Sequence, residues 1–232
     1  MLKLSSLHYS PATAATPVLQ NLSLEAGVGR PVLIAGASGS GKTSLMDVIS
    51  GLSPQQSGQI QWNNRVMTRR QRRWLCGLVF QFPERHFLGL TVGQELRLGH
   101  RRLSSDQQQS VLSQVGLGGL SLQQAPERLS GGQQRRLALA VQLLRGAEVL
   151  LLDEPTAGLD WSVRSDVLDL LAELSQKRVV VVVTHEPQLF EGWNCDRFRL
   201  KDGGLEPVST FCLLYTSPSP RDATLSRMPS SA

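Results

Sequence analysis

The sequence has few cysteines and no long hydrophobic stretch, and each shortage excludes a class of protein. Its three cysteines, Cys76, Cys195 and Cys212, are widely spaced and form no C-x-x-C pair. This argues against a disulfide framework or a zinc site and favours a reducing compartment. No segment approaches the roughly 20 consecutive apolar residues that cross a bilayer, and the aliphatic runs Val149–Leu152 and Val179–Val183 fit central strands instead. We therefore expect that, if the protein functions at a membrane, it does so through a partner protein.

Acidic residues are outnumbered. The chain has 24 lysines and arginines against 19 aspartates and glutamates, a formal net charge of +5. The excess is concentrated in the run RRQRR at residues 69–73 and in the arginine pair at residues 101–102. No aromatic ladder for stacking bases accompanies these arginines, and we expect no nucleic-acid partner. A solvated basic face and attraction to an anionic membrane surface are the two interpretations of the cluster.

Strand and helix patterns alternate along most of the 232 residues. The predicted strands cover residues 2–9, 18–25, 31–35, 58–62, 78–81, 148–152 and 178–184, with a hairpin over 196–208. The predicted helices cover residues 43–50, 92–120, 128–145 and 161–176, with caps at Ser104 and Ser105 inside the second. This alternation predicts an α/β fold with a mainly parallel sheet and an antiparallel portion at the amino terminus.

The carboxyl end differs from the rest of the chain. From about Phe211 the periodicity is lost, and serine, proline and threonine become frequent. Two interpretations are open: a native flexible tail, or a foreign appendage, since the segment resembles a translated adapter beyond a lost stop codon. We predict one domain over residues 1–208 and a disordered or non-native tail over residues 209–232.

A glycine-rich motif carries the clearest chemistry. It fits G-x-x-x-x-G-K-[ST] and consists of Gly36, Ala37, Ser38, Gly39, Ser40, Gly41, Lys42 and Thr43. The apolar run Val32–Ala35 precedes it and a helix follows, so that loop amides and a helix amino terminus face one anion. Lys42 is expected to reach the β- and γ-phosphates of a nucleotide, and the Thr43 hydroxyl to ligate Mg²⁺. A chance Gly/Ser turn before a helix is the competing interpretation.

A second motif places two acids at the end of an aliphatic strand. Asp153 and Glu154 directly follow Val149–Leu152, and the carboxyl ends of strands in α/β sheets are where ligands bind. Asp153 suits Mg²⁺, usually through water, and Glu154 suits a general base that polarises the attacking water. Acids that merely end a strand are the alternative, which the phosphate-binding motif in the same chain argues against.

A third motif indicates a family. The sequence LSGGQ opens a predicted helix and contains Ser130, Gly131, Gly132 and Gln133. It resembles the signature motif of ATP-binding cassette (ABC) proteins. A serine and a glycine pair at a helix start supply a hydroxyl, unhindered amides and a dipole to a γ-phosphate. The other motifs of the family follow in the expected order, and the resemblance covers about residues 1–208.

This resemblance assigns roles to four further residues. Tyr9 matches the aromatic that stacks on adenine, and Gln81 matches the Q-loop glutamine, which serves catalysis and Mg²⁺ binding. Asp160 matches the D-loop acid beside the nucleotide, and His185 the catalytic switch histidine. Three of them have a structural alternative. Tyr9 could be a packing tyrosine, Gln81 a surface glutamine, and His185 a capping or core histidine. Asp160 is also expected to cap the helix that begins near Trp161.

The resemblance implies a P-loop NTPase with a RecA-like core and a helical subdomain around residues 85–145. It implies ATP and Mg²⁺ as ligands, and a second ATPase chain, identical or different, paired head to tail. Each ATP would lie between Lys42 of one chain and Ser130–Gln133 of the other. A signature helix facing its own phosphate loop would only duplicate that loop's anion site.

The segment from Phe80 to Glu95 resembles the Q-loop region of energy-coupling-factor and cobalt-type importers, apart from His86, where a glutamine is frequent. In those proteins the region faces an integral membrane subunit. Its apolar members are Phe82, Phe87, Leu88 and Leu90, for which docking and local packing are both open. The resemblance therefore implies an ATPase on the cytoplasmic side of a membrane that energises a transporter, and it favours an importer. A soluble cassette ATPase, for example of the iron–sulfur assembly type, and a nucleotide-binding regulator are the alternatives.

Overall fold

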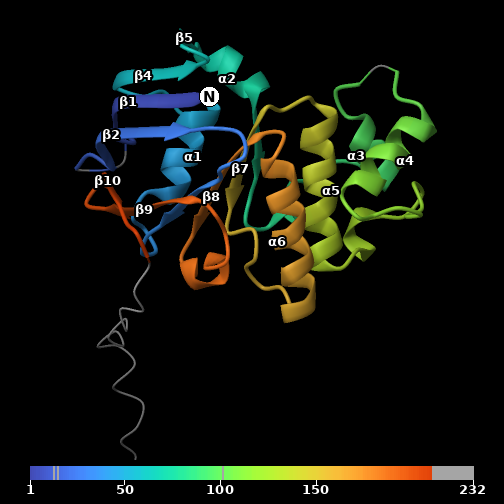
Figure 1. The fold of residues 1–232 in the computed structure, drawn as a ribbon. Coiled ribbons are helices and arrows are strands. Elements are labelled where there is room, and N and C mark those ends of the chain that lie inside the picture. The colour runs from blue at the N-terminus through green and yellow to red at the C-terminus, as the bar shows by residue number, and fades with distance from the viewer. Residues whose placement is uncertain (13, 15, 101, 211–232) are drawn as a thin grey trace, which may run out of the picture.

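The computed structural model describes residues 1–12, 14, 16–100 and 102–210, whose strands form two sheets (Figure 1). The strands are β1 (Leu2–Tyr9), β2 (Leu19–Ala26), β3 (Val32–Ala35), β4 (Ser57–Trp62), β5 (Arg65–Val66), β6 (Cys76–Val79), β7 (Val149–Asp153), β8 (Val179–Thr184), β9 (Asp196–Lys201) and β10 (Gly204–Pro207). The smaller sheet is antiparallel with the order β2-β1-β4-β5. In the larger sheet, β9-β3-β8-β7-β6 are parallel neighbours and β10 joins antiparallel to β9. The predicted α/β fold with a mainly parallel sheet is confirmed.

Six α-helices and three 3₁₀ turns lie within the described part of the chain. The helices are α1 (Lys42–Ser50), α2 (Arg69–Leu75), α3 (Val92–Arg97), α4 (Ser105–Gln114), α5 (Gly131–Leu144) and α6 (Trp161–Ser175). The 3₁₀ turns are η1 (Pro83–His86), η2 (Pro126–Arg128) and η3 (Pro187–Phe190). Among these described helices, none combines the length and apolar character needed to cross a membrane.

The larger sheet separates two hydrophobic clusters, and alternate residues of β3, β7 and β8 enter opposite clusters. Val32 and Ile34 of β3 belong to the cluster that also takes in α1 and the leucines of the smaller sheet. Leu33 between them belongs to the other cluster, which includes residues of α3, α4, α5 and α6. Because side chains of a strand point alternately to its two faces, both faces of the sheet are covered. This burial holds the strand ends, where the predicted site residues lie, in fixed relative positions.

The helices of the predicted subdomain gather at one side of the molecule. There α3 and α4 pack against α5, and α5 in turn contacts β6 and α6 (Figure 1). The cluster that contains Val92 and Leu112 of these helices continues without a break to Val180 of the sheet. The division into a core and a helical subdomain around residues 85–145 therefore remains a prediction.

Three predicted element boundaries were wrong. The helical pattern over 92–120 is two helices separated by a turn that contains Gly99, whose φ is +83°. Ser104, and not Ser105, caps α4, since its hydroxyl accepts a hydrogen bond from Gln107 N–H at 3.2 Å. The strand expected at 78–81 is β6, which begins two residues earlier. Gly77 obscured this start, but a side chain there would overlap Gln142, so close packing of α5 requires a glycine in the strand.

Helix α2 contains the basic run and was not predicted. Arg69 Nε and Arg73 Nε donate hydrogen bonds to Gly51 O at 3.3 and 3.1 Å, just past the end of α1. Arg72 is fully buried and donates to Gln55 Oε1 at 2.9 Å. The interpretation as a solvated basic face therefore fails for Arg72, whereas the other three arginines of the run are exposed. The arginine at position 101 and the predicted tail from position 211 lie outside the described residues.

Candidate functional site

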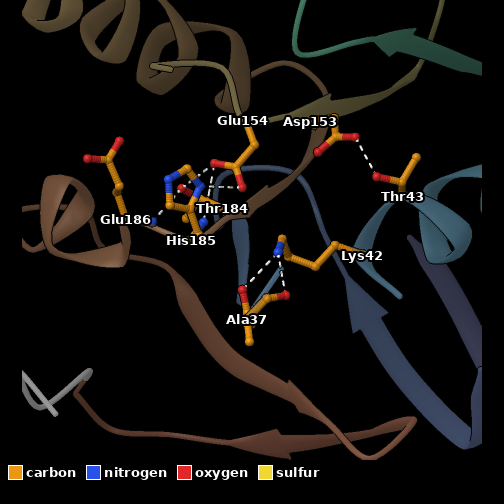
Figure 2. Close-up of polar contacts among 9 residues, drawn as sticks. Ala37, Lys42, Thr43, Asp153, Glu154, Thr184, His185 and Glu186 are labelled. Carbon is orange, nitrogen blue, oxygen red and sulfur yellow. Dashed lines mark hydrogen bonds and ion pairs between the residues drawn. The ribbon is translucent and has the colours of Figure 1, made fainter. Parts of the chain in front are cut away.

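The glycine-rich loop connects β3 to α1. Gly39 and Gly41 have φ angles of +78° and +100°, a left-handed backbone that glycine adopts without steric cost. The buried ammonium of Lys42 donates hydrogen bonds to Gly36 O at 2.8 Å and Ala37 O at 3.0 Å (Figure 2). Among the described residues no carboxylate forms an ion pair with this ammonium. The loop therefore holds a buried positive charge without a counter-ion from that part of the chain.

A second polar group of the loop also lacks a partner. Ser40 Oγ is buried and makes no hydrogen bond within the residues that the structure covers. A side chain at Gly36 would overlap this hydroxyl, so glycine at that position leaves room for it. Buried polar groups normally have partners, and an anion such as a nucleotide phosphate would supply one to the Ser40 hydroxyl and to Lys42.

Thr43 and Asp153 meet although they are far apart in the sequence. Thr43 lies in the first turn of α1 and Asp153 ends β7, and the threonine hydroxyl donates to Asp153 Oδ2 at 2.9 Å (Figure 2). Burial raises the pKa of the Asp153 carboxyl, and the hydrogen bond from Thr43 opposes part of that rise. A hydroxyl beside a carboxylate is the kind of oxygen pair that suits Mg²⁺.

Glu154 is held in an unusual backbone conformation. Its φ is +48°, in the left-handed region that residues with side chains rarely enter. Thr184 Oγ1 and His185 N–H donate to Glu154 Oε2 at 2.9 and 3.2 Å, and His185 Nδ1 lies 2.8 Å from Oε1 (Figure 2). The end of β8 thus orients a buried carboxylate from three directions, as a general base requires.

Thr184 is a site residue that the sequence reasoning missed. It is fully buried, and its hydroxyl accepts a hydrogen bond from Glu186 N–H at 3.0 Å while donating to Glu154. The sequence signal was present, because Thr184 is the first polar residue after the five valines of Val179–Val183. A polar side chain that ends a buried strand lies at the edge where α/β sheets bind ligands.

Gln81 lies two residues beyond the end of β6, in the loop before η1. Its carbonyl oxygen accepts a hydrogen bond of 2.7 Å from Arg135 Nη2, so α5 fixes the backbone of this loop. The side chain of Gln81 is half-buried, and no hydrogen bond within the described residues occupies it. Gln81 is therefore neither a strand residue nor a fully solvated surface glutamine.

Tyr9, at the end of β1, lies close to the phosphate loop. Its carbonyl accepts a hydrogen bond from Val18 N–H at 2.9 Å, and a side chain on Gly41 would overlap Val18. The half-buried Tyr9 ring also packs against the cluster of the smaller sheet, and its hydroxyl lies 3.4 Å from Ser53 Oγ. The position is compatible with both interpretations, a packing tyrosine and a residue that borders a bound base.

The signature residues begin α5. Ser130 Oγ accepts from Gln133 N–H at 3.3 Å, and Gln133 Oε1 accepts from Ser130 N–H at 2.9 Å, which is a capping box. A side chain on Gly132 would overlap Val163 of α6, so this glycine is required for close packing of the two helices. Gly131 is exposed and leaves the amide end of α5 accessible.

The predicted capping role of Asp160 is wrong. Asp160 has the backbone conformation of an N-cap before α6, but its side chain makes no capping hydrogen bond. This helix end is exposed, so water can satisfy the first amides of α6 instead. The exposed Asp160 carboxylate and the neighbouring Trp161, 76% exposed, leave this end of α6 open.

Most of the predicted residues lie at one edge of the larger sheet. The phosphate loop follows β3, Asp153 ends β7 with Glu154 directly after it, and His185 follows β8. The order of these three strands in the sheet is β3-β8-β7, and neighbours are parallel. A side chain on Gly131 would lie 3.6 Å from Leu159, so the signature residues border the loop that leads from β7 to α6. Within the described residues no hydrogen bond or ion pair joins residues 130–133 to residues 36–43.

Comparisons of the sequence with known proteins point to one family. Residues 19–157 match the family described as ABC transporter. The chain is 37% identical over 189 residues to ABC transporter I family member 11, chloroplastic, of Arabidopsis thaliana, covering 75% of this chain and 68% of that protein. It is 34% identical over 194 residues to the energy-coupling factor transporter ATP-binding protein EcfA2 of Lactiplantibacillus plantarum, covering 77% of this chain and 66% of that protein.

Two solved structures resemble the fold closely. The structure of cbiO1 from Clostridium perfringens, described as part of the ABC transporter complex cbiONQ, aligns with a TM-score of 0.78 and 28% identity, covering 88% of this chain and 86% of that one. The dimeric structure of MJ0796, described as a bacterial ABC transporter cassette, aligns with a TM-score of 0.73 and 27% identity, covering 89% of this chain and 97% of that one. Each similarity covers nearly nine tenths of this chain.

Proposed function

The chain belongs to the ABC transporter family, and on this premise we propose how its residues share the work of ATP hydrolysis. It is an ATPase that energises transport by a membrane ABC transporter. One observation carries the assignment of roles: Lys42, the Thr43–Asp153 pair and the Glu154–His185 pair meet at the ends of three parallel strands. A polyphosphate, a divalent cation and a general base fit together at this edge.

The phosphate loop binds the phosphates of ATP. The backbone N–H groups of Gly36–Gly41 and the amino terminus of α1 face the anion, and the Lys42 ammonium exchanges its carbonyl partners for the β- and γ-phosphates. The buried hydroxyl of Ser40, which has no hydrogen-bond partner among the described residues, supports this role, because a phosphate oxygen would satisfy it. Tyr9 stacks on the adenine, in keeping with its position beside the loop.

The Thr43 hydroxyl and the Asp153 carboxylate would hold Mg²⁺, and the side chain of Gln81, from the loop after β6, would supply a further oxygen. The hydrogen-bonded pair of oxygen donors supports this assignment. When bound, the ion neutralises charge on the transferring phosphate. EDTA is expected to abolish phosphate release from ATP, and added Mg²⁺ to restore it; turnover that persists in EDTA would contradict the metal site.

Glu154 polarises the water that attacks the γ-phosphate. Thr184 and His185 supply the three contacts that fix its carboxylate, so the base is oriented before the substrate arrives. His185 belongs to the catalytic group because its side chain, 53% exposed, lies 2.8 Å from the buried carboxylate of Glu154.

A second copy of the chain completes each site. Ser130–Gln133 and Asp160 meet the ATP held by the partner's phosphate loop, in a head-to-tail pair. The exposed starts of α5 and α6, which carry these residues, support the arrangement. So does the similarity to a cassette of known dimeric structure.

The membrane subunit docks on the segment after Gln81. Leu88 and Leu90 are 81% and 80% exposed and Phe82 is 42% exposed, an apolar group that a membrane subunit would cover. We propose that the chain lies at the cytoplasmic face of a membrane and serves an importer. This proposal is supported by the similarity to an energy-coupling factor transporter ATP-binding protein.

The double substitution Leu88→Asp with Leu90→Asp is expected to abolish co-purification of a polytopic membrane subunit from solubilised membranes. Phosphate release by the isolated chain should be unchanged, because both side chains are largely exposed to solvent. Val66→Asp is the matched control, since Val66 is 59% exposed on β5 and should retain the subunit. Retention of the subunit by the double variant would contradict the docking surface.

A further inference from the structure

Arg135 joins two functional loops through one buried side chain. It lies on α5 and is only 4% exposed. Its Nη2 donates to Gln81 O at 2.7 Å, and its Nη1 donates to Ala157 O at 3.1 Å. The two acceptor residues, Gln81 and Ala157, are 76 positions apart in the sequence. One guanidinium therefore connects the loop after β6 to the loop after β7.

The environment of this guanidinium is unusual for a buried charge. Within the described residues no carboxylate forms an ion pair with Arg135, and its Nε has no hydrogen-bond partner. Burial lowers the pKa of the Arg135 side chain, and the electrostatic effect of Glu84 offsets part of that lowering. A buried charge satisfied mainly by two backbone carbonyls costs free energy, so packing alone gives no reason for an arginine here.

The second loop leads directly to the catalytic base. The N–H of Ala157 donates to Glu154 O at 3.1 Å, while its carbonyl accepts from Arg135. The peptide units around Ala157 therefore connect Arg135 to the residue whose backbone is in the left-handed conformation. The same loop continues to Asp160 at the start of α6.

We propose that Arg135 is a positioning residue that makes α5, the Gln81 loop and the Glu154–Asp160 loop move as one unit. The inference rests on the proposed function, in which the first loop continues to the membrane-subunit docking segment and the second carries the base. The fork of a guanidinium spans two carbonyls at fixed separation, which an ammonium does not. Movement of the docking segment would thus reach both the base and the signature residues at the start of α5.

Arg136 offers a matched control on the same helix. Its Nη2 pairs with Asp166 at 3.1 Å and its Nη1 donates to Gly116 O at 3.4 Å, so it contacts neither loop. Arg135→Gln is expected to lower kcat for ATP by roughly 10²-fold, the effect of a displacement of about 1 Å at a catalytic group. KM and the affinity for ATP should change little, because Arg135 does not contact the phosphate loop. Arg136→Gln should leave kcat close to that of the wild type.

A double-mutant cycle on kcat between Arg135 and Gln81 distinguishes a positioning role of Arg135 from a general loss of stability. If Arg135 acts by holding the Gln81 loop, Gln81→Ala combined with Arg135→Gln should lower kcat no further than the worse single variant. Gln81→Ala combined with Arg136→Gln should show the product of the two single effects. Arg135→Lys, which keeps the charge and loses the fork, should reproduce most of the loss if Arg135→Gln does not fold.

Two results would overturn the proposal. One is a multiplicative effect of Gln81→Ala and Arg135→Gln; the other is a loss of kcat in both arginine variants that follows their loss of thermal stability. Failure of the proposed function has a different signature, since the wild-type chain would then release no phosphate from ATP under any condition. The comparison is made on the full chain by phosphate release, nucleotide binding and thermal unfolding.

Discussion

Replacing Glu154 by glutamine is expected to lower the kcat of ATP hydrolysis by roughly 10²–10⁴-fold, the usual contribution of a general base. ATP binding should persist, because the substitution keeps the size of the side chain and does not touch the phosphate loop. A glutamine oxygen can still accept from Thr184 and His185, the donors that now hold the carboxylate. Binding by calorimetry and single-turnover phosphate release would measure the two effects separately.

Glu186→Gln is the matched control for this variant. Glu186 lies two residues beyond Thr184, and its carboxylate points away from Glu154 (Figure 2). The same chemical change at Glu186 should leave kcat near the wild-type value. Equal loss of turnover in both variants, or full turnover in Glu154→Gln, would contradict the assignment of Glu154 as the base.

Replacing Lys42 by alanine is expected to weaken ATP binding and to lower kcat/KM by roughly 10²–10³-fold, as for loss of a preorganised charge at a transition state. Lys42 is buried, and its ammonium is already oriented by Gly36 O and Ala37 O. A bound polyphosphate would replace these two carbonyl oxygens as acceptors for the ammonium. Titration of ATP by calorimetry and measurement of initial rates would give both quantities.

Two further variants complete that experiment. Lys42→Arg keeps the charge but should not restore binding, because a planar guanidinium does not fit where a buried ammonium contacts two carbonyls. Lys177→Ala removes one exposed lysine just beyond α6 and should leave binding unchanged. Wild-type affinity in Lys42→Ala would show that the loop does not hold the phosphates through this residue.

The sequence was sufficient to predict the elements whose chemistry is local. The aliphatic runs became β7 and β8, and the glycine motif became a loop between a strand and a helix, because hydrophobic periodicity and glycine spacing determine such elements directly. Membership in the ABC transporter family, predicted from LSGGQ and the order of the other motifs, is confirmed. The roles of the individual site residues remain proposals that the variants above test.

Features that depend on contacts between distant segments could not be predicted. The run RRQRR was interpreted as a charged surface, because no local signal shows that Arg72 is buried against Gln55. Gly77 weakened the strand pattern at the start of β6, and the packing of Gln142 that explains it comes from a helix far along the chain. Likewise Arg135 was only one of two arginines after the signature motif, until the fold placed it between two loops.

The most direct test of a nucleotide site shared between two copies of the chain is the assembly state of Glu154→Gln in the presence of Mg²⁺ and ATP. Sedimentation velocity measures this state. We expect monomers without nucleotide and dimers with ATP. Adding Ser130→Arg should prevent the dimer while ATP binding remains, because the signature residues would no longer fit against the partner's nucleotide. A chain that binds ATP and remains monomeric, or a dimer unaffected by Ser130→Arg, would contradict a site shared between two copies.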